Sequence, residues 1–290
     1  MLESLSEKGY SIVPKVLNEQ EIDYASHLFW NWIGEMECQF PGIEDIHSTI
    51  DPHGIFKHHQ AGHTAHSWYI RTRKGVQEPF KQIYDTKDLI VSFDGCCWMT
   101  RSKYRNKKDN IWTHTDQAAC YSDFKCIQGF VSLTNNKHSS LVVYEGSHKL
   151  HESYFKNKQD TSKKNWNKID IDYLEEIKDK RKVLEVNAGD LVLWDSRTFH
   201  QNQYGNPNCE DRIVQYVCFL PKNHKDNTST NRKKRQLYFQ ERRTTSHWPC
   251  PIHVNGLQPR TYGKEELKID YSLCVEPDYE EWDEEINKLL

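Results

Sequence analysis

The chain has no long hydrophobic run and no excess of positive charge. Its 290 residues have a mean hydropathy of -0.88, and no apolar stretch approaches the roughly 18 residues that cross a membrane. We therefore expect a soluble protein without a membrane partner. The formal net charge of -3 and the pI of about 6.6 argue against a surface built to bind nucleic acid.

Paired cysteine motifs are also absent. The nine cysteines form an odd set without a Cys-x-x-Cys pair, and the opening residues MLESLSEKGY contain no apolar signal segment. Because disulfides persist mainly in oxidising compartments, we expect reduced thiols and a cytoplasmic location. Cys96 and Cys97 are adjacent in an apolar run, which predicts buried free thiols.

Short apolar or alternating runs fill residues 88–221 and are bounded by Gly, Asn or Asp. They include CIQGFVSLT, SLVVYEG, KVLEVNAGDLVLWD and IVQYVCFLP. This pattern predicts an antiparallel β core with helical flanks. Residues 18–36 predict one of these helices, with Asn18 and Glu21 placed as a capping box, and residues 276–290 predict a terminal helix.

We expect one domain over residues 1–290, because sandwiches and barrels of this length occur as one unit. Residues 151–182 are expected to be an insert over one end of the core, and residues 222–290 a C-terminal extension over the core. Residues 40–68 have Gly, Pro and His without steady periodicity, which predicts a long loop. YIRTR (69–73) is interpreted as a strand and NRKKR (231–235) as a solvated loop. Nothing in the sequence indicates an oligomeric state.

The stretch WTHTDQ (112–117) places His114 and Asp116 two positions apart. On an extended chain both side chains leave the same face and could bind one ion. So short a motif also arises by chance, and a second His-x-Asp pair, His224 with Asp226, lies among Lys and Asn in a predicted solvated loop. Only the first pair has a candidate third ligand: His200 follows the alternating strand in AGDLVLWDSRTFHQN. Two imidazoles and one carboxylate form the facial ligand set of mononuclear iron oxygenases.

Arg212 stands twelve residues after His200, at the start of the strand RIVQYVCFL. A guanidinium suits a carboxylate because it pairs in bidentate fashion and stays charged. A strand, a short turn and a second strand would bring Arg212 close to His200. The order of His-x-Asp, distal His and Arg therefore indicates a metal site beside a carboxylate-binding cation.

These stretches resemble the phytanoyl-CoA dioxygenase-like family of Fe(II)/2-oxoglutarate-dependent oxygenases. The resemblance runs from about residue 5 to residue 220 and includes GYSIVPKVLNEQEI, HTD (114–116), LVVYEGSHK (141–149) and AGDLVLWDSRTFHQN with DRIVQYV. It implies a mainly β fold with flanking α-helices, the double-stranded β-helix (jelly-roll, cupin-like) barrel.

The resemblance also implies a ligand set. His114, Asp116 and His200 would bind Fe(II), and 2-oxoglutarate would chelate the metal with its distal carboxylate held by Arg212. Asn202 and Gln128 are implied as further contacts to the cosubstrate. With O2, such a site would hydroxylate a substrate and release succinate and CO2.

The retained carboxylate of Asp116 argues against halogenation, because halogenating relatives have a small residue there. The His, Arg and Trp residues of segments 40–75 and 225–262 suggest a small polar or anionic substrate. Fold and ligand set do not by themselves choose among small molecules.

Two other functions stay open at this point. The chain could be a non-catalytic β-barrel module that binds a ligand or a protein partner, or a cupin-like isomerase or hydrolase that needs no cosubstrate. A rival metal site is HHQAGHTAH (58–66), in which His59, His63 and His66 could hold zinc on a helical turn. Loop histidines that face solvent or substrate are the alternative. Arg71 is expected at the surface or in contact with an anionic ligand.

Overall fold

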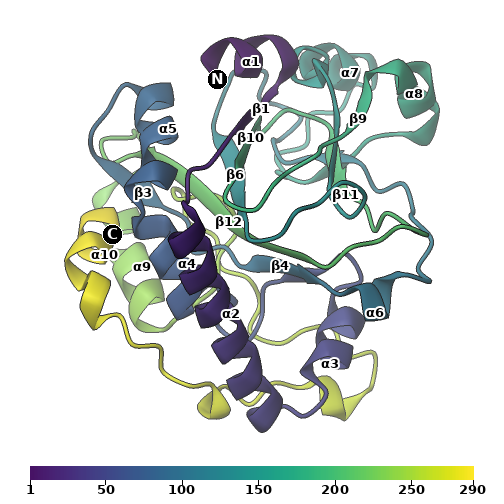
Figure 1. The fold of residues 1–290 in the computed structure, drawn as a ribbon. Helices are drawn as coiled ribbons and strands as arrows, with labels where there is room; N and C mark the ends of the chain where they lie inside the picture. The colour runs from purple at the N-terminus through teal and green to yellow at the C-terminus, as the bar shows by residue number, and fades with distance from the viewer.

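Two antiparallel β-sheets lie at the centre of the computed structural model, which describes residues 1–290 (Figure 1). The seven-stranded sheet has the order β1 (Tyr10–Val13), β10 (Leu191–Asp195), β6 (Ile127–Ser132), β12 (Arg212–Pro221), β4 (Cys96–Met99) and β2 (Ile55–Phe56), with β3 (Leu89–Val91) also paired to β12. The five-stranded sheet has the order β8 (Asn167–Lys168), β5 (His114–Thr115), β11 (His200–Asn202), β7 (Leu141–Tyr144) and β9 (Arg181–Val183). This arrangement is the expected double-stranded β-helix.

The two sheets pack face to face through a shared apolar cluster. Phe130 and Val192 of the larger sheet lie in one cluster with Leu141 and Val143 of the smaller sheet. Side chains alternate along β12, so Val214 faces this cluster while Ile213 packs on the opposite side. Both faces of the larger sheet are therefore buried, which explains the nearly continuous apolar run of β12.

Helices cover the outer face of the larger sheet (Figure 1). They are α2 (Glu19–Gln39), α4 (Ala65–Thr72), α5 (Lys74–Tyr84), α9 (Ser229–Gln240) and α10 (Asp283–Leu289), and α1 (Leu2–Lys8) packs near β1. The predicted capping box of α2 is confirmed: Asn18 accepts from the backbone N–H of Glu21, and the Glu21 carboxylate accepts from the backbone N–H of Asn18. The predicted terminal helix is present as α10, which is shorter than the predicted range of 276–290. None of the helices is both long and apolar enough to cross a membrane.

Three local predictions were wrong. Residues 40–68 are not a plain loop, since they contain α3 (Ile43–Ile50), β2 and the 3-10 helix η1 (Ala61–His63). YIRTR is part of helix α4, not a strand, and NRKKR lies in helix α9. Nearly every residue of α4 is buried, so its sequence shows no polar face that would reveal a helical period. Thr64 caps α4 and Thr228 caps α9 through side-chain oxygens.

Residues 151–182 extend the smaller sheet as well as covering it. They form α7 (His151–Asn157), α8 (Ile171–Glu176) and η3 (Lys178–Lys180), while β8 pairs with β5 and β9 pairs with β7. The remaining short elements are α6 (Arg101–Tyr104), η2 (Ser147–Lys149), η4 (Glu265–Leu267), η5 (Tyr271–Leu273) and η6 (Glu280–Trp282). Strand β5 is thus held between β8 and β11, which places His114 well inside the sheet.

Candidate metal centre

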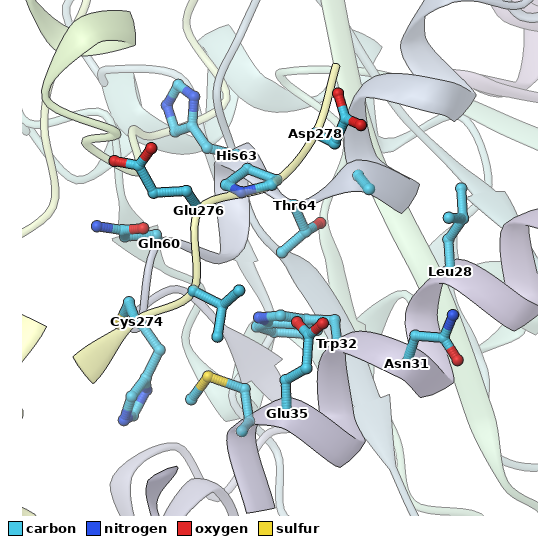
Figure 2. Close-up of a pocket in the computed structure, with 15 residues that line it drawn as sticks. Leu28, Asn31, Trp32, Glu35, Gln60, His63, Thr64, Cys274, Glu276 and Asp278 are labelled. Atoms are coloured by element: carbon cyan, nitrogen blue, oxygen red, sulfur yellow. The ribbon is translucent and has the colours of Figure 1, made fainter. Parts of the chain in front are cut away.

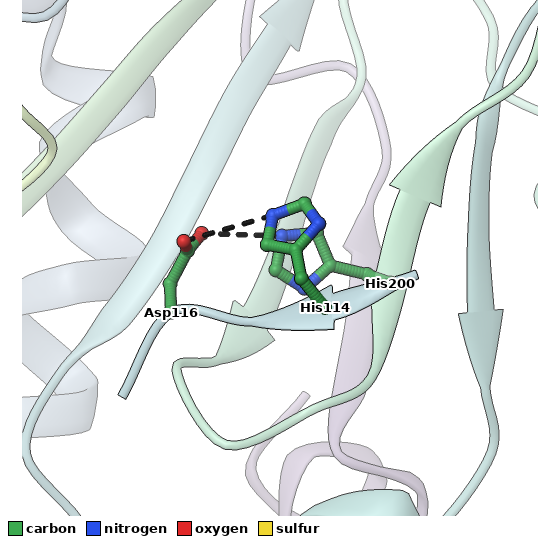
Figure 3. A group of neighbouring side chains, drawn as sticks. All are labelled: His114, Asp116 and His200. Carbon is green, nitrogen blue, oxygen red and sulfur yellow. Dashed lines mark ion pairs between the residues drawn. The ribbon is translucent and has the colours of Figure 1, made fainter. Parts of the chain in front are cut away.

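Three side chains that are distant in sequence meet on the inner side of the smaller sheet. His114 on β5 is the direct antiparallel partner of His200 on β11, and Asp116 follows two residues after His114. The Nε2 atoms of the two rings lie 3.6 Å and 3.3 Å from the Asp116 carboxylate oxygens, for His114 and His200 respectively (Figure 3). One ligand atom from each residue lies within 4.8 Å of the other two. This set can hold one metal ion.

The other nitrogen of each ring is fixed by the backbone. His114 Nδ1 donates to the carbonyl of Trp112 at 3.2 Å, and His200 Nδ1 donates to the carbonyl of Thr198 at 2.9 Å. These bonds leave both Nε2 atoms as acceptors that face Asp116, the arrangement that metal-binding imidazoles require. Gln128 Nε2 donates to Asp116 Oδ2 at 3.2 Å and restrains the carboxylate.

The protonation states of His114 and Asp116 also suit a metal ion. Burial lowers the pKa of His114, against the opposing attraction of Asp116, which favours the neutral ring. Burial would raise the pKa of Asp116, but the electrostatic influence of the nearby imidazoles, above all His114, outweighs it and holds that pKa well below its usual range. Metal ions bind neutral imidazole and ionised carboxylate.

The three residues line a cavity of about 530 Å³. This volume lies in the range of roughly 300–1,000 Å³ that holds small-molecule ligands. Trp112 and Trp166 line it beside His114, and Ser246 and His247 line it from the C-terminal segment. Burial lowers the pKa of His247 to about 4 although the Asp116 carboxylate acts in the opposite direction, so this ring is neutral near pH 7. Sequence reasoning placed residues 225–262 near the substrate but singled out neither Ser246 nor His247.

Arg212 lies on β12 with its side chain inside the sandwich, 5.2 Å above the ring of Phe130. Its Nη1 donates to Cys97 Sγ at 3.6 Å, while its Nη2 is buried without a hydrogen-bond partner. Tyr216, four residues further on the same face, lines the cavity, and its hydroxyl accepts from Asn202 Nδ2 at 3.2 Å. A buried guanidinium without a carboxylate partner is costly, so this corner fits a ligand that brings one.

Arg212 itself is not among the residues that line the cavity, whereas the other two predicted cosubstrate contacts are. Asn202 and Gln128 both line it, and both are almost fully buried. The contact of Gln128 is with the ligand Asp116, as described above. The second His-x-Asp pair does not line the cavity. His224 Nδ1 and Asp226 Oδ2 lie 3.8 Å apart in the loop after β12.

The histidines of residues 58–66 are not solvated. His59, His63 and His66 are each about 1% exposed, and burial lowers the pKa of each to about 3. Each packs against aromatic rings such as Phe40, Phe93 and Phe29 respectively. The only group of three close metal-binding side chains is the one around Asp116, so the rival zinc site is not formed.

A second cavity, of about 240 Å³, lies outside the sandwich between α2, η1 and residues 274–278 (Figure 2). Trp32 and Glu35 line it from α2, His63 and Thr64 from the η1 region, and Cys274 from the C-terminal segment. It shares no lining residue with the metal centre. The three candidate metal ligands all line the larger cavity and none lines this one.

The expectation for Arg71 was wrong. Arg71 is fully buried in α4 and donates to the carbonyls of Gly62 and Asp94, both at 2.6 Å, with the Asp94 carboxylate 3.6 Å away. Burial raises the pKa of Asp94 to about 6, opposed by Arg71. Arg71 thus ties η1 to the loop after β3 instead of facing solvent or a ligand.

Residues 43–203, more than half of the chain, match the family model described as phytanoyl-CoA dioxygenase (PhyH). The chain belongs to the phytanoyl-CoA dioxygenase family. The matched region contains His114, Asp116 and His200 but ends before Arg212 and before the whole C-terminal segment. A protein of Aspergillus versicolor described as "Ava biosynthesis cluster protein O" is 25% identical over 245 residues, which are 78% of this chain and 79% of that protein.

Solved structures of other proteins share the fold. EctD from S. alaskensis, solved with 2-oxoglutarate and 5-hydroxyectoine, superposes with a TM-score of 0.51 at 12% identity and covers 76% of this chain and 74% of its own. The non-heme monooxygenase ThoJ gives a TM-score of 0.50 at 12% identity, with 76% and 77% covered. These superpositions show that the fold is shared. Sequence identities this low leave the substrate open.

Proposed function

We propose that this member of the phytanoyl-CoA dioxygenase family is an Fe(II)- and 2-oxoglutarate-dependent dioxygenase that hydroxylates a small polar or anionic molecule and releases succinate and CO2. The observation that carries the proposal is the convergence of His114, Asp116 and His200 in one cavity. The donor set, two neutral imidazoles and one carboxylate on one side of a site, is the set used by ferrous oxygenases that bind a cosubstrate and O2 at the remaining positions.

The unpaired guanidinium of Arg212 supports 2-oxoglutarate as the cosubstrate. Its Nη2 is a buried donor without a partner, and Tyr216 and Asn202 lie beside it as hydrogen-bonding groups. The distal carboxylate of 2-oxoglutarate would supply the missing acceptor in a bidentate or single charge-assisted bond. EctD, which shares the fold, is described with 2-oxoglutarate bound.

The bound ferrous ion would supply the oxidising chemistry, using O2 and the decarboxylation of 2-oxoglutarate. The chain's own residues do the rest. His114, Asp116 and His200 hold the ion from one side, and the carbonyls of Trp112 and Thr198 keep both rings in the metal-binding tautomer. The carboxylate of Asp116 occupies a ligand position that a halide would need, which favours hydroxylation over halogenation.

The proposal treats residues 1–290 as one catalytic unit, since the C-terminal segment lines the same cavity as the metal ligands. Residues 151–182 belong to this unit through β8, which flanks the strand of His114. The cytoplasmic location expected from the sequence suits nine cysteines that are all free thiols.

The test is succinate release from 2-oxoglutarate in the presence of Fe(II), ascorbate and O2. We expect the wild type to form succinate slowly without a substrate and faster with a member of a broad metabolite panel. His114→Ala should abolish both rates, because it removes a ligand. The matched control His224→Ala changes the other His-x-Asp motif and should leave both rates unchanged.

Two outcomes would count against the proposal. If His114→Ala released succinate as fast as the wild type, the triad would not be the site of turnover. If the wild type bound no 2-oxoglutarate and formed no succinate with any compound, the non-catalytic binding module would be the better account.

A further inference from the structure

Two polar side chains of the C-terminal segment face the metal cavity without a hydrogen-bond partner. Ser246 and His247 both line the cavity that contains His114, Asp116 and His200. Ser246 Oγ and His247 Nε2 are buried and make no hydrogen bond within the protein. Buried polar atoms are normally paired, so two neighbouring exceptions beside a reaction centre point to a ligand that pairs them.

The backbone holds these two residues in place. The N–H of Thr245 donates to the carbonyl of Phe93 at 2.8 Å, and the N–H of Phe93 donates to Thr245 Oγ1 at 3.0 Å. The N–H of Ser246 donates to the carbonyl of His253 at 2.8 Å. Thr244 Oγ1 accepts from the N–H of Gly62 at 3.1 Å. The pair is therefore presented by a segment tied to two other parts of the chain, which is the rigidity that a recognition site needs.

Aromatic rings form another part of the cavity lining. Trp112 stacks on His53 with ring centres 4.0 Å apart and on His114 at 4.9 Å, with interplanar angles of 21° and 22°. Trp166 also stacks on His114, at 5.2 Å and 28°, and it is 52% exposed although it is a large apolar ring. Trp112 is already stacked against two imidazoles, so the ring surface that remains free for a flat ligand is the exposed side of Trp166.

The acidic groups that line the same cavity away from the metal already have cationic partners. Lys57 Nζ lies 3.0 Å from Asp51 Oδ2, and Asp94 is paired with the buried Arg71. The other lysine that lines the cavity is Lys168, which is exposed at the edge of the smaller sheet. The buried end of the cavity thus offers hydrogen-bonding groups but no unpaired charge, and the free ring face of Trp166 lies at its exposed edge, where Lys168 also lies.

We propose that Ser246 and His247 bind an uncharged amide, or a comparable donor and acceptor pair, on a planar aromatic substrate that packs against Trp166. This inference rests on the proposed function and narrows its substrate class from polar or anionic to polar and uncharged. Both residues lie beyond residue 203, where the family match ends. The hydrogen-bonding part of this recognition surface therefore lies outside the family match, whereas Trp166 lies inside it.

The test uses three small probes of similar size: benzamide, benzoate and cyclohexanecarboxamide. Their dissociation constants are measured by ligand-observed NMR on full-length protein that is saturated with 2-oxoglutarate and Ni(II), so that no turnover occurs and the Arg212 corner is filled. We expect benzamide to bind more tightly than the other two. Benzoate tests the charge, and cyclohexanecarboxamide tests the flat ring.

The variants then test the two side chains. Ser246→Ala and His247→Phe should each raise the dissociation constant of benzamide about three- to tenfold, the effect of one hydrogen bond. His247→Gln should recover most of the loss, because it restores a polar group at nearly the same reach, which a purely structural role would not explain. His253→Ala, an exposed histidine of the same segment, serves as the matched control.

The inference is overturned if benzoate binds more tightly than benzamide, or if Ser246→Ala and His247→Phe bind benzamide as the control does. Failure of the proposed function looks different. In that case 2-oxoglutarate itself does not bind, and the probes are measured with Ni(II) alone; the benzamide preference and its loss in the variants persist and still support this recognition surface.

Discussion

Acid should destabilise this protein strongly because three imidazoles are buried without charge. His59, His63 and His66 lie among aromatic rings, and burial lowers the pKa of each from 6.5 to about 3. In the unfolded chain these rings regain ordinary pKa values and take up protons below about pH 6.5. Their contribution to stability is therefore present at neutral pH and is lost as the pH falls from about 6.5 toward 3.

The size of the effect follows from proton linkage. Each imidazole that titrates only in the unfolded chain lowers the free energy of unfolding by about 1.4 kcal/mol for every pH unit below its pKa in the unfolded chain. At pH 5 this amounts to about 2 kcal/mol for one ring and about 6 kcal/mol for three, relative to neutral pH. The total stability of a typical protein is about 5–15 kcal/mol, so these rings alone could consume much of it.

His59→Phe isolates one ring. Both nitrogens of His59 lack partners and its ring packs edge-on against Phe40 and Phe56, so phenylalanine keeps an aromatic ring there and removes no hydrogen bond. Urea unfolding at pH 7 and pH 5, followed by tryptophan fluorescence, gives the loss of unfolding free energy for each protein. We expect this loss to be about 2 kcal/mol smaller in the variant than in the wild type.

The control for this experiment is His27→Phe, which replaces an exposed imidazole on α2 and should leave the acid sensitivity as it is in the wild type. If His59→Phe lost as much stability between pH 7 and pH 5 as the wild type, the ring of His59 would have to be protonated inside the fold. That result would refute the description of residues 58–66 as a buried, neutral cluster.

Three further changes test single contacts. Arg212→Leu should weaken 2-oxoglutarate binding about 10- to 100-fold in calorimetry with Ni(II) present, because it removes a charge-assisted bond; equal affinity would exclude Arg212 from the site. Gln128→Leu should weaken metal binding about tenfold or more by releasing Asp116, and an unchanged metal affinity would contradict that support. Arg235→Met should lower the unfolding free energy by about 2–3 kcal/mol, since it leaves the carbonyls of Pro249 and Leu289 unpaired; a neutral result in urea unfolding would show that this anchor is dispensable.

The proximity of the candidate metal ligands could be predicted in part because strand geometry links the spacing of residues to the direction of their side chains. On a strand, positions two apart share a face, so the His-x-Asp of WTHTDQ predicted two side chains on one side. The alternating run before His200 and the apolar run after Arg212 predicted the strands β10 and β12. Direct pairing of His114 with His200 is long-range and had to come from the fold.

Helix α4 shows why other parts were not readable. Its residues are buried on nearly all sides, so a helical period in hydrophobicity is missing, and His66 and Arg71 looked like loop and surface residues. Arg235 was also placed wrongly, because a basic run predicts side chains exposed to solvent. Its guanidinium is instead buried and donates to backbone carbonyls near the C-terminus. Polar residues whose partners are distant carbonyls leave no local signal in a sequence.

The central claim is that His114, Asp116 and His200 hold one ferrous ion to which 2-oxoglutarate adds. An anaerobic titration of the protein with Fe(II) and then with 2-oxoglutarate, followed by visible absorption, tests it directly. We expect one iron per chain and a metal-to-ligand charge-transfer band that saturates with the cosubstrate, in the wild type and in His224→Ala. The band should be missing in His200→Ala. A band of full intensity in His200→Ala, or none in the wild type with iron bound, would contradict this account.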